Sequence, residues 1–215
     1  MSEIDVSQIS VSQIVGDFEF HITASDADAS ALGWWADERD VKFTHILLAR
    51  GETVSQPMLT VRANGTTASV LAEAEAIVDE LQACGCDVTR VKLEASPFAD
   101  GVPATAEQAA TQPADRYFEH HLKLLLPPDA DESALADLVT PHGAHLSRNA
   151  RRTRDDGRAE RFVTQRCHLV GTDAAVTSLD RLTEVLRAAD HEIISIEREY
   201  VVYDSRPSVD AGWIR

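Results

Sequence analysis

The sequence contains no run of about 18 apolar residues, only three cysteines and only three lysines. Without a long apolar run, no segment is expected to span a membrane as a helix. Residues 1–16 have neither a basic start nor a continuous apolar stretch, so we do not expect a signal peptide. An odd number of cysteines (Cys84, Cys86 and Cys167) without an export signal favours a reducing compartment. The sequence therefore predicts a cytoplasmic protein.

Negative charge dominates the chain. The formal net charge is -16, with 36 acidic residues against 20 lysines and arginines. This balance repels phosphate backbones and anionic lipid headgroups, which disfavours nucleic acid and membrane surfaces as partners. Apolar residues make up 44% of the 215 residues, which is sufficient for a packed core. The composition is therefore that of an ordinary globular protein.

One short stretch occurs twice at a spacing of 100 residues. Phe18-Glu19-Phe20-His21-Ile22-Thr23 returns as Phe118-Glu119-His120-His121-Leu122-Lys123. In the first stretch apolar and polar side chains alternate, which is typical of a half-buried strand. Further matches follow at offsets of 100, 104 and 105: His45-Ile46 with His145-Leu146, Thr60 and Arg62 with Thr164 and Arg166, Leu81 and Glu94 with Leu186 and Glu199. Because the offset only increases along the chain, we predict an internal duplication.

Hydrophobic periodicity predicts the same order of elements in both copies. The predicted strands are residues 17–25, 41–49, 57–62, 87–95, 116–126, 144–152, 161–169 and 192–203. The predicted helices are residues 29–39, 66–83, 131–140 and 172–188. Each copy thus has the order βαββαβ, which is the ferredoxin-like arrangement.

This order predicts an α+β protein of two tandem ferredoxin-like repeats. Its parts are an N-terminal arm (1–16), a first repeat (17–96), a proline-containing linker (97–115), a second repeat (116–204) and a C-terminal tail packed on the body (205–215). Each repeat would be an antiparallel four-stranded sheet with both helices on one face. The two open faces would then meet, or the sheets would curl together as one pseudo-two-fold α+β barrel.

Strand alternation predicts which side chains share the open face. Phe18, Phe20 and Ile22 should face the helices, so that Glu19 and His21 point away from them. Each copy then places Glu, His, Thr, Arg and Glu on one sheet face: Glu19, His21, Thr60, Arg62 and Glu94, and Glu119, His121, Thr164, Arg166 and Glu199.

If these faces meet, they form a semi-enclosed polar cavity with three kinds of candidate site. His with Glu can act as a base and its orienting group, so the candidate catalytic residues are His21, His121, Glu19 and Glu119. Basic and hydroxyl side chains can hold a phosphate or carboxylate, and the candidates are Arg62, Arg166, Thr60, Thr164, Lys92, Lys123, Arg148 and Arg151. Carboxylates can ligate a divalent metal, and the candidates are Glu94, Glu197 and Glu199. The alternative is a solvated polar sheet face without a function.

His21-Ile22-Thr23 resembles the His-hydrophobic-Thr signature of the two-histidine phosphoesterases, which also carry two such motifs in a duplicated fold. The second copy departs from this signature, because Lys123 stands where a hydroxyl is required. The resemblance implies a phosphoester hydrolase.

Arginines are concentrated in one predicted hairpin: Arg148, Arg151, Arg152, Arg154, Arg158, Arg161 and Arg166. They could bind an acidic partner or an anion. Alternatively, they belong to a solvated edge hairpin and pair with the nearby Asp155, Asp156 and Glu160.

Two functional hypotheses follow. The first is a protein that binds an anionic, phosphorylated small molecule in the cavity between the repeats and hydrolyses its phosphoester, with a divalent metal as the candidate cofactor. The second is a non-enzymatic interaction protein that binds an acidic partner through residues 148–166. No P-loop, Rossmann fingerprint, nucleophile elbow or zinc motif is present to decide between them. The sequence indicates no oligomeric state.

Overall fold

The computed structural model describes residues 13–150 and 155–213, which form eight strands and five α-helices. The strands are β1 (Val15–Ala24), β2 (Lys42–Leu48), β3 (Ser55–Thr66), β4 (Val88–Ala95), β5 (Tyr117–Leu126), β6 (Ala144–Asn149), β7 (Ala159–His168) and β8 (Glu192–Asp204). The helices are α1 (Ala29–Arg39), α2 (Thr67–Ala83), α3 (Ala106–Ala109), α4 (Glu132–Val139) and α5 (Thr172–Ala188). Three 3₁₀ turns complete the description: η2 (Asp26–Asp28), η3 (Thr140–His142) and η4 (Pro207–Asp210).

All eight strands pair antiparallel and close into one barrel in the order β1-β3-β2-β6-β7-β5-β8-β4. The first strand of each half lies in the middle of its own four strands, β1 between β3 and β4, and β5 between β7 and β8. The halves are joined where β2 pairs with β6 and β4 pairs with β8. The predicted α+β class is confirmed, and the two predicted sheets are joined into a single barrel. Closure satisfies backbone groups that would be unpaired at the edges of separate sheets.

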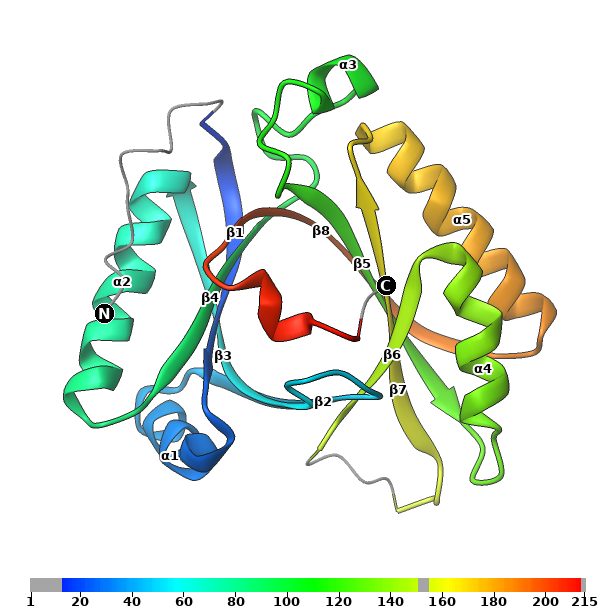
Figure 1. Ribbon diagram of the computed structural model, residues 1–215, viewed down its shortest axis with the longest axis horizontal. Coiled ribbons are helices and arrows are strands. Elements are labelled where there is room, and N and C mark those ends of the chain that lie inside the picture. Colours follow the sequence, from blue (N-terminus) through cyan, green and yellow to red (C-terminus); the bar gives the residue numbers. More distant parts are fainter. Residues whose placement is uncertain (1–12, 151–154, 214–215) are drawn as a thin grey trace.

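The helices cover the outside of the barrel, with α1 and α2 beside the first half and α4 and α5 beside the second (Figure 1). Phe18, Phe20 and Ile22 are at most 3% exposed and belong to the apolar cluster under α1 and α2. A second apolar cluster, which includes Leu122 and Leu182, packs under α4 and α5. Burying each such side chain contributes about 1.5–3 kcal/mol. Because strands alternate, apolar residues on the outer faces leave polar residues for the interior of the barrel.

Two predicted irregular segments are partly ordered: the linker (97–115) contains a short helix, and the end of the N-terminal arm (1–16) belongs to the first strand. Residues 97–115 contain the short helix α3, whose N-terminus is capped by the Thr105 side chain. Of the predicted N-terminal arm, residues 1–12 lie outside the described residues. Ile14 is fully buried and Val15 begins β1, so residues 13–16 belong to the body. None of the described helices is both long and apolar enough to cross a bilayer.

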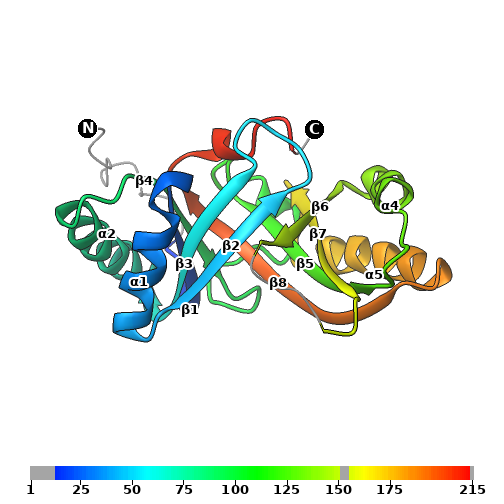
Figure 2. The ribbon, with the colours of Figure 1, turned by 90° about the horizontal axis from the view of Figure 1, so that it is seen from below.

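The C-terminal segment turns back across one end of the barrel after β8: it lies in the middle of the ring of strands in Figure 1 and at the top of the view in Figure 2. Trp213 is only 5% exposed, and its indole Nε1 donates a hydrogen bond to the Leu146 carbonyl at 2.9 Å. The C-terminal segment therefore contacts the second half from above and brings its own side chains to the barrel interior.

Candidate functional site

Strand register places equivalent polar residues opposite one another in both halves. His21 lies opposite Thr60 and Glu19 opposite Arg62 in the pairing of β1 with β3. In the pairing of β5 with β7, His121 lies opposite Thr164 and Glu119 opposite Arg166. Both imidazoles use Nδ1 to contact the threonine hydroxyl at 3.0 Å. The first and last strands also correspond, because Glu19 lies opposite Glu94 and Glu119 opposite Glu199.

A cavity of about 140 Å³ lies inside the barrel and is lined by residues of both halves. The first half contributes His21 and Lys92, and the second half contributes His121. Residues from η4 and the C-terminal segment, Asp210 and Trp213, also line it. The two histidines therefore share one cavity, as the meeting of the two polar faces predicts.

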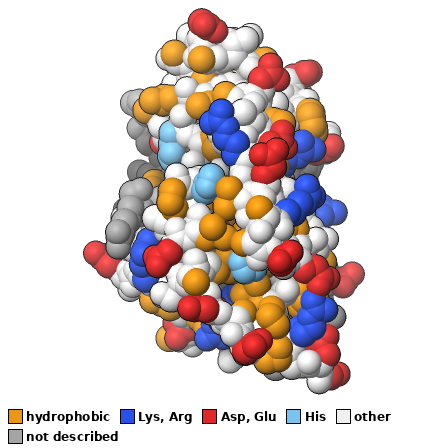
Figure 3. Space-filling model, turned by 90° about the vertical axis from the view of Figure 1, so that its right-hand side faces the viewer, with side chains coloured by type: hydrophobic (Ala, Val, Ile, Leu, Met, Phe, Trp, Pro, Cys, Tyr) orange, Lys and Arg blue, Asp and Glu red, His pale blue; other side chains and the backbone are white. Residues whose placement is uncertain are grey.

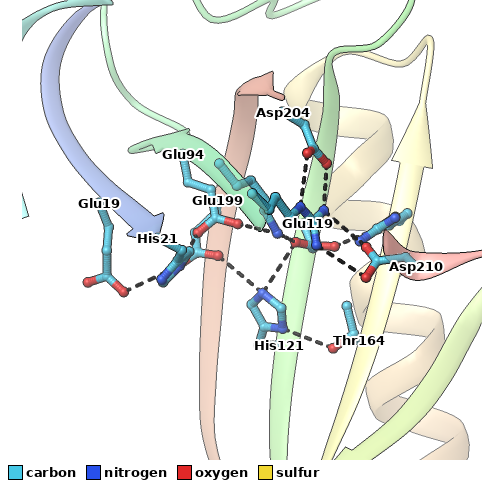
Figure 4. A network of polar contacts seen from close by, with 12 residues as sticks. Glu19, His21, Glu94, Glu119, His121, Thr164, Glu199, Asp204 and Asp210 are labelled. Carbon is cyan, nitrogen blue, oxygen red and sulfur yellow. Dashed lines mark hydrogen bonds and ion pairs between the residues drawn. The ribbon is translucent and has the colours of Figure 1, made fainter. Parts of the chain in front are cut away.

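Glu119 is the centre of the polar network, and its side chain is fully buried (Figure 4). Its Oε1 accepts a hydrogen bond from Arg166 Nε at 2.5 Å, and its Oε2 accepts one from Lys92 Nζ. Lys92 comes from β4 of the first half, so this ion pair crosses between the halves. Lys92 also lies 2.6 Å from Glu94 Oε1.

The two histidines each contact a glutamate of the last strand in their half. His21 Nε2 lies 2.9 Å from Glu94 Oε2, and His121 Nε2 lies 3.2 Å from Glu199 Oε2. His121 also lies 3.5 Å from Glu119 Oε2. With neutral imidazoles, these partners assign the proton to Nε2 and leave Nδ1 to accept from the threonine hydroxyl.

Burial and neighbouring charges move the pKa values of the second-half residues in different directions. Burial raises the pKa of Glu199 to about 7, the charge of Glu94 acts in the same sense, and His121 opposes the increase. Burial alone would raise the pKa of Glu119, but Arg166 and Lys92 hold that pKa well below 4.5. Burial alone would lower the pKa of His121, but contacts with Glu119 and Glu199 raise it well above 6.5. Near neutral pH, Glu199 and His121 thus hold protons close to other carboxylates.

Four of these residues could hold a metal ion. Glu94, Glu119, His121 and Glu199 each place one oxygen or nitrogen within 4.8 Å of the others. Glu94 Oε1 and Glu199 Oε2 are buried and make no regular hydrogen bond, and their nearest donors are Lys92 Nζ at 2.6 Å and His121 Nε2 at 3.2 Å. Three carboxylates with one imidazole form a donor set suited to Mn²⁺, Fe²⁺ or Zn²⁺.

The C-terminal segment completes the network from the other side. Asp204 accepts two hydrogen bonds from Arg90, at 2.9 and 2.5 Å. Asp210 accepts from both Arg90 and Arg166. The network then has five carboxylates (Glu94, Glu119, Glu199, Asp204 and Asp210) against three basic side chains (Arg90, Lys92 and Arg166), an excess of two negative charges with neutral histidines.

Most of the predicted site residues lie together, and some do not. His21, His121, Thr60, Thr164, Arg166, Lys92, Glu19, Glu119, Glu197 and Glu199 line the cavity, and Glu94 contacts His21. Arg62 does not line it, because its side chain is 87% exposed and pairs with Glu19 on the outside. Lys123 pairs with Glu160 instead, at 3.8 Å, and Arg148 is exposed. Arg151 lies outside the described residues.

Three residues of the network, Arg90, Asp204 and Asp210, were not among the predicted site residues. Arg90 alternates with Lys92 on β4 and is therefore predictable as an inward-facing side chain. Asp204 and Asp210 follow the periodic part of the last strand, and no local pattern indicates that they enter the barrel. His21 contacts Thr60 rather than Thr23, so the hydroxyl of the His-Ile-Thr motif is not its partner.

The fold and site define an α+β barrel protein with a charged internal cavity. No family model and no curated protein matches the chain. Among solved structures, a mutant chlorite dismutase from Candidatus Nitrospira defluvii is 9% identical, covering 91% of this chain and 93% of that chain with a TM-score of 0.31. A candidate monooxygenase from Lactobacillus acidophilus is 13% identical, covering 89% and 93% of the two chains with a TM-score of 0.31. We take no ligand or reaction from likenesses this distant.

Proposed function

We propose that this protein binds a divalent cation at Glu94, Glu119, His121 and Glu199 and uses it to hold an anionic small molecule in the cavity. The observation that supports this most directly is the convergence of four ligand atoms within 4.8 Å. Two buried carboxylate oxygens of this group, Glu94 Oε1 and Glu199 Oε2, make no regular hydrogen bond and are held by ion-pair contacts with Lys92 and His121. A cation would ligate both oxygens directly.

The charge balance of the network supports a cation in preference to a directly bound anion. Arg90, Lys92 and Arg166 are each paired with carboxylates of the protein, so their charges are already compensated. Near neutral pH, protons on Glu199 and His121 neutralise the excess negative charge, because the pKa values of both groups are raised. A divalent ion would replace these protons and provide the positive charge that an anionic ligand requires.

Hydrolysis of a phosphoester is the reaction class that these groups fit. A bound divalent ion polarises an ester oxygen and activates water. His21 lines the cavity beside the proposed ligand Glu94, and its Nδ1, which accepts from the Thr60 hydroxyl, is the atom that would take up a proton. His121 is assigned to the ion and His21 to proton transfer, so the two equivalent histidines have different roles.

We also propose that the two halves, residues 17–96 and 116–204, arose by duplication. The equal registers of His21 with Thr60 and His121 with Thr164 support this. The halves have diverged in burial, because the Glu19–Arg62 pair is exposed at the arginine whereas the side chain of Glu119 is fully buried. Three of the four proposed ligands, Glu119, His121 and Glu199, belong to the second half, and Glu94 comes from the first.

The alternative of an acidic partner bound by the arginine hairpin has less support. Arg158 pairs with Glu192, and Arg161 pairs with Glu132 at 2.5 Å, so these charges are compensated within the chain. On the face over α4 and α5, basic side chains lie among acidic ones (Figure 3). The remaining arginines of the predicted stripe between 151 and 154 lie outside the described residues.

Metal binding is tested by titrating the chelator-treated protein with Mn²⁺ or Zn²⁺ and measuring its melting temperature. At a concentration of about 100 times the dissociation constant, binding should stabilise the fold by about 2.7 kcal/mol. For a chain of this size, that corresponds to an increase of about 5–10 °C. Glu199→Gln and His121→Ala should abolish most of the increase, because each removes one ligand atom.

Glu197→Gln is the matched control, because Glu197 lines the same cavity two positions earlier on β8 but is not in the ligand group. It should retain the response of the unsubstituted protein. An equal response of Glu197→Gln and Glu199→Gln, or no response of the unsubstituted protein to either ion, would refute the proposed site. With the ion that binds, the rate of hydrolysis of phosphomonoesters and phosphodiesters should then be measured for the unsubstituted protein and for His21→Ala. The rate should be lower for His21→Ala.

A further inference from the structure

The C-terminal segment, residues 205–213, inserts one carboxylate into the barrel. Asp210 ends η4 and is 5% exposed, and the segment that carries it crosses one end of the barrel (Figures 1 and 2). A polar side chain at this depth requires a set of donors that compensates its charge. The identity of those donors indicates what the position is suited to bind.

Asp210 is held by donors from three strands of the barrel. Arg90 on β4 donates from Nη1 to Oδ1 at 3.2 Å and from Nη2 to Oδ2 at 3.0 Å. Arg166 on β7 donates from Nη2 to Oδ2 at 2.6 Å, and Gln56 on β3 donates from Nε2 to Oδ1 at 3.1 Å. A forked guanidinium with a second guanidinium and an amide matches the geometry of any free carboxylate or phosphate.

These donors are oriented independently of Asp210. Arg90 remains bonded to Asp204 at 2.9 Å, and Arg166 remains bonded to Glu119 at 2.5 Å. If the Asp210 carboxylate moved away, both guanidinium groups would therefore keep their positions and present uncompensated N–H donors. The donors would then form a pre-organised anion subsite. The folded protein already orders these side chains, so anion binding does not lose their conformational entropy again.

The segment that carries Asp210 is attached separately from the two apolar clusters. Trp213 is buried but belongs to neither cluster. Besides the buried side chains of Val209 and Trp213, hydrogen bonds anchor the segment: Glu52 N–H donates to the Ala211 carbonyl at 3.0 Å, and Arg50 Nε donates to the Trp213 carbonyl at 3.3 Å. Gly51 has φ of 122°, and a Cβ at this residue would lie 3.0 Å from the Ala211 carbonyl oxygen, so this close approach requires glycine. Such a segment can separate without unfolding either core.

We propose that Asp210 occupies, as an internal carboxylate, the subsite for the carboxylate or phosphate group of a small-molecule ligand, and that residues 205–213 are displaced when the ligand binds. This deepens the proposed function, because the subsite adjoins the candidate metal ligands through Glu119. Arg166 contacts both Asp210 and Glu119, so an anion on the guanidinium groups lies next to the metal position. Residues 205–213 then act as a lid, and the Asp210 carboxylate of this lid competes with the ligand for Arg90 and Arg166.

The test uses the full chain labelled with 5-fluorotryptophan, in chelator, titrated with inorganic phosphate or with succinate at constant ionic strength. The chain has three tryptophans, and Trp213→Phe assigns the ¹⁹F signal of Trp213. Saturable movement of this signal is expected for the preferred anion, and comparing the two titrations distinguishes phosphate from carboxylate. Asp210→Asn should bind that anion about tenfold more tightly, because the internal competitor loses its charge-assisted hydrogen bonds.

Asp204→Asn is the matched control, because Asp204 pairs with the same Arg90 but belongs to β8 and is not displaced in the proposal. It should not tighten anion binding. If neither anion moves the Trp213 signal and Asp210→Asn binds no more tightly, the proposal is wrong. Because chelator is present, a failure of metal binding leaves this result unaffected, and a failure here leaves the metal titration unaffected.

Discussion

Replacing Glu119 by glutamine is expected to lower the free energy of unfolding by about 3–5 kcal/mol. Glu119 is fully buried and accepts from Arg166 and Lys92, which are themselves almost completely buried. Removal of its charge leaves Lys92 with Glu94 alone and Arg166 with Asp210 alone, and removing one partner of a buried ion pair is strongly destabilising. Guanidinium denaturation of the chelator-treated protein, followed by circular dichroism, measures this loss.

Glu19→Gln provides the internal comparison for this experiment. Glu19 is the equivalent residue of the first half, but its partner Arg62 is 87% exposed. Exposed ion pairs contribute about 0–1 kcal/mol, so this variant should be nearly neutral. Equal losses for Glu19→Gln and Glu119→Gln would show that the network around Glu119 does not hold the two halves of the barrel together.

Replacing Glu199 by glutamine is expected to flatten the pH dependence of stability between about pH 4.5 and pH 7. Burial raises the pKa of Glu199 from 4.5 in the unfolded chain to about 7 in the folded protein. The folded state thus binds the proton more tightly, so this stabilising contribution is complete below pH 4.5 and is lost as the pH rises to 7. The loss is on the order of 3 kcal/mol, because each pKa unit corresponds to about 1.4 kcal/mol.

Other groups of the site constrain how this result is interpreted. The raised pKa of His121 acts in the same sense, since its contribution is present below pH 6.5 and is lost as the pH rises through the folded value. Glu119 acts oppositely, because its lowered pKa contributes stability above pH 4.5 that disappears in acid. We would measure the free energy of unfolding of the metal-free protein, Glu199→Gln and Glu197→Gln at several pH values. Glu197→Gln removes the same charge, so the difference between the two variants gives the contribution of Glu199. Identical profiles for the two variants would contradict the assignment.

The secondary structure was predictable because its signals are local. Alternation in residues 17–25 and helical spacing from Val70 to Leu81 depend only on neighbours along the chain, and β1 and α2 follow both patterns. The strand–helix order occurs twice, which was also readable from the spacing of the repeated stretches. The short helix α3 was missed, since four residues carry too little periodicity to distinguish a helix from a linker.

The membership of the site was only partly predictable. Alternation correctly placed His21, His121 and Glu119 on one face, but it treated Arg62 and Arg166 as equivalent. Only the path of the C-terminal segment distinguishes them, because Asp210 contacts Arg166 and leaves Arg62 in solvent. The same alternation placed Lys123 on this face, and Lys123 lies opposite Phe162, which lines the cavity, but its amine pairs with Glu160.

By itself, the sequence determined the α+β class, the positions of the strands and helices, and which residues of β1 and β5 turn toward the barrel interior. These properties arise from periodicity, which acts over a few residues. Tertiary structure decided that the strands close into one barrel, that Lys92 joins Glu119 across the two halves, and that Asp210 reaches Arg90. Such contacts connect residues far apart in the chain, and their free energy depends on burial, which no local pattern contains.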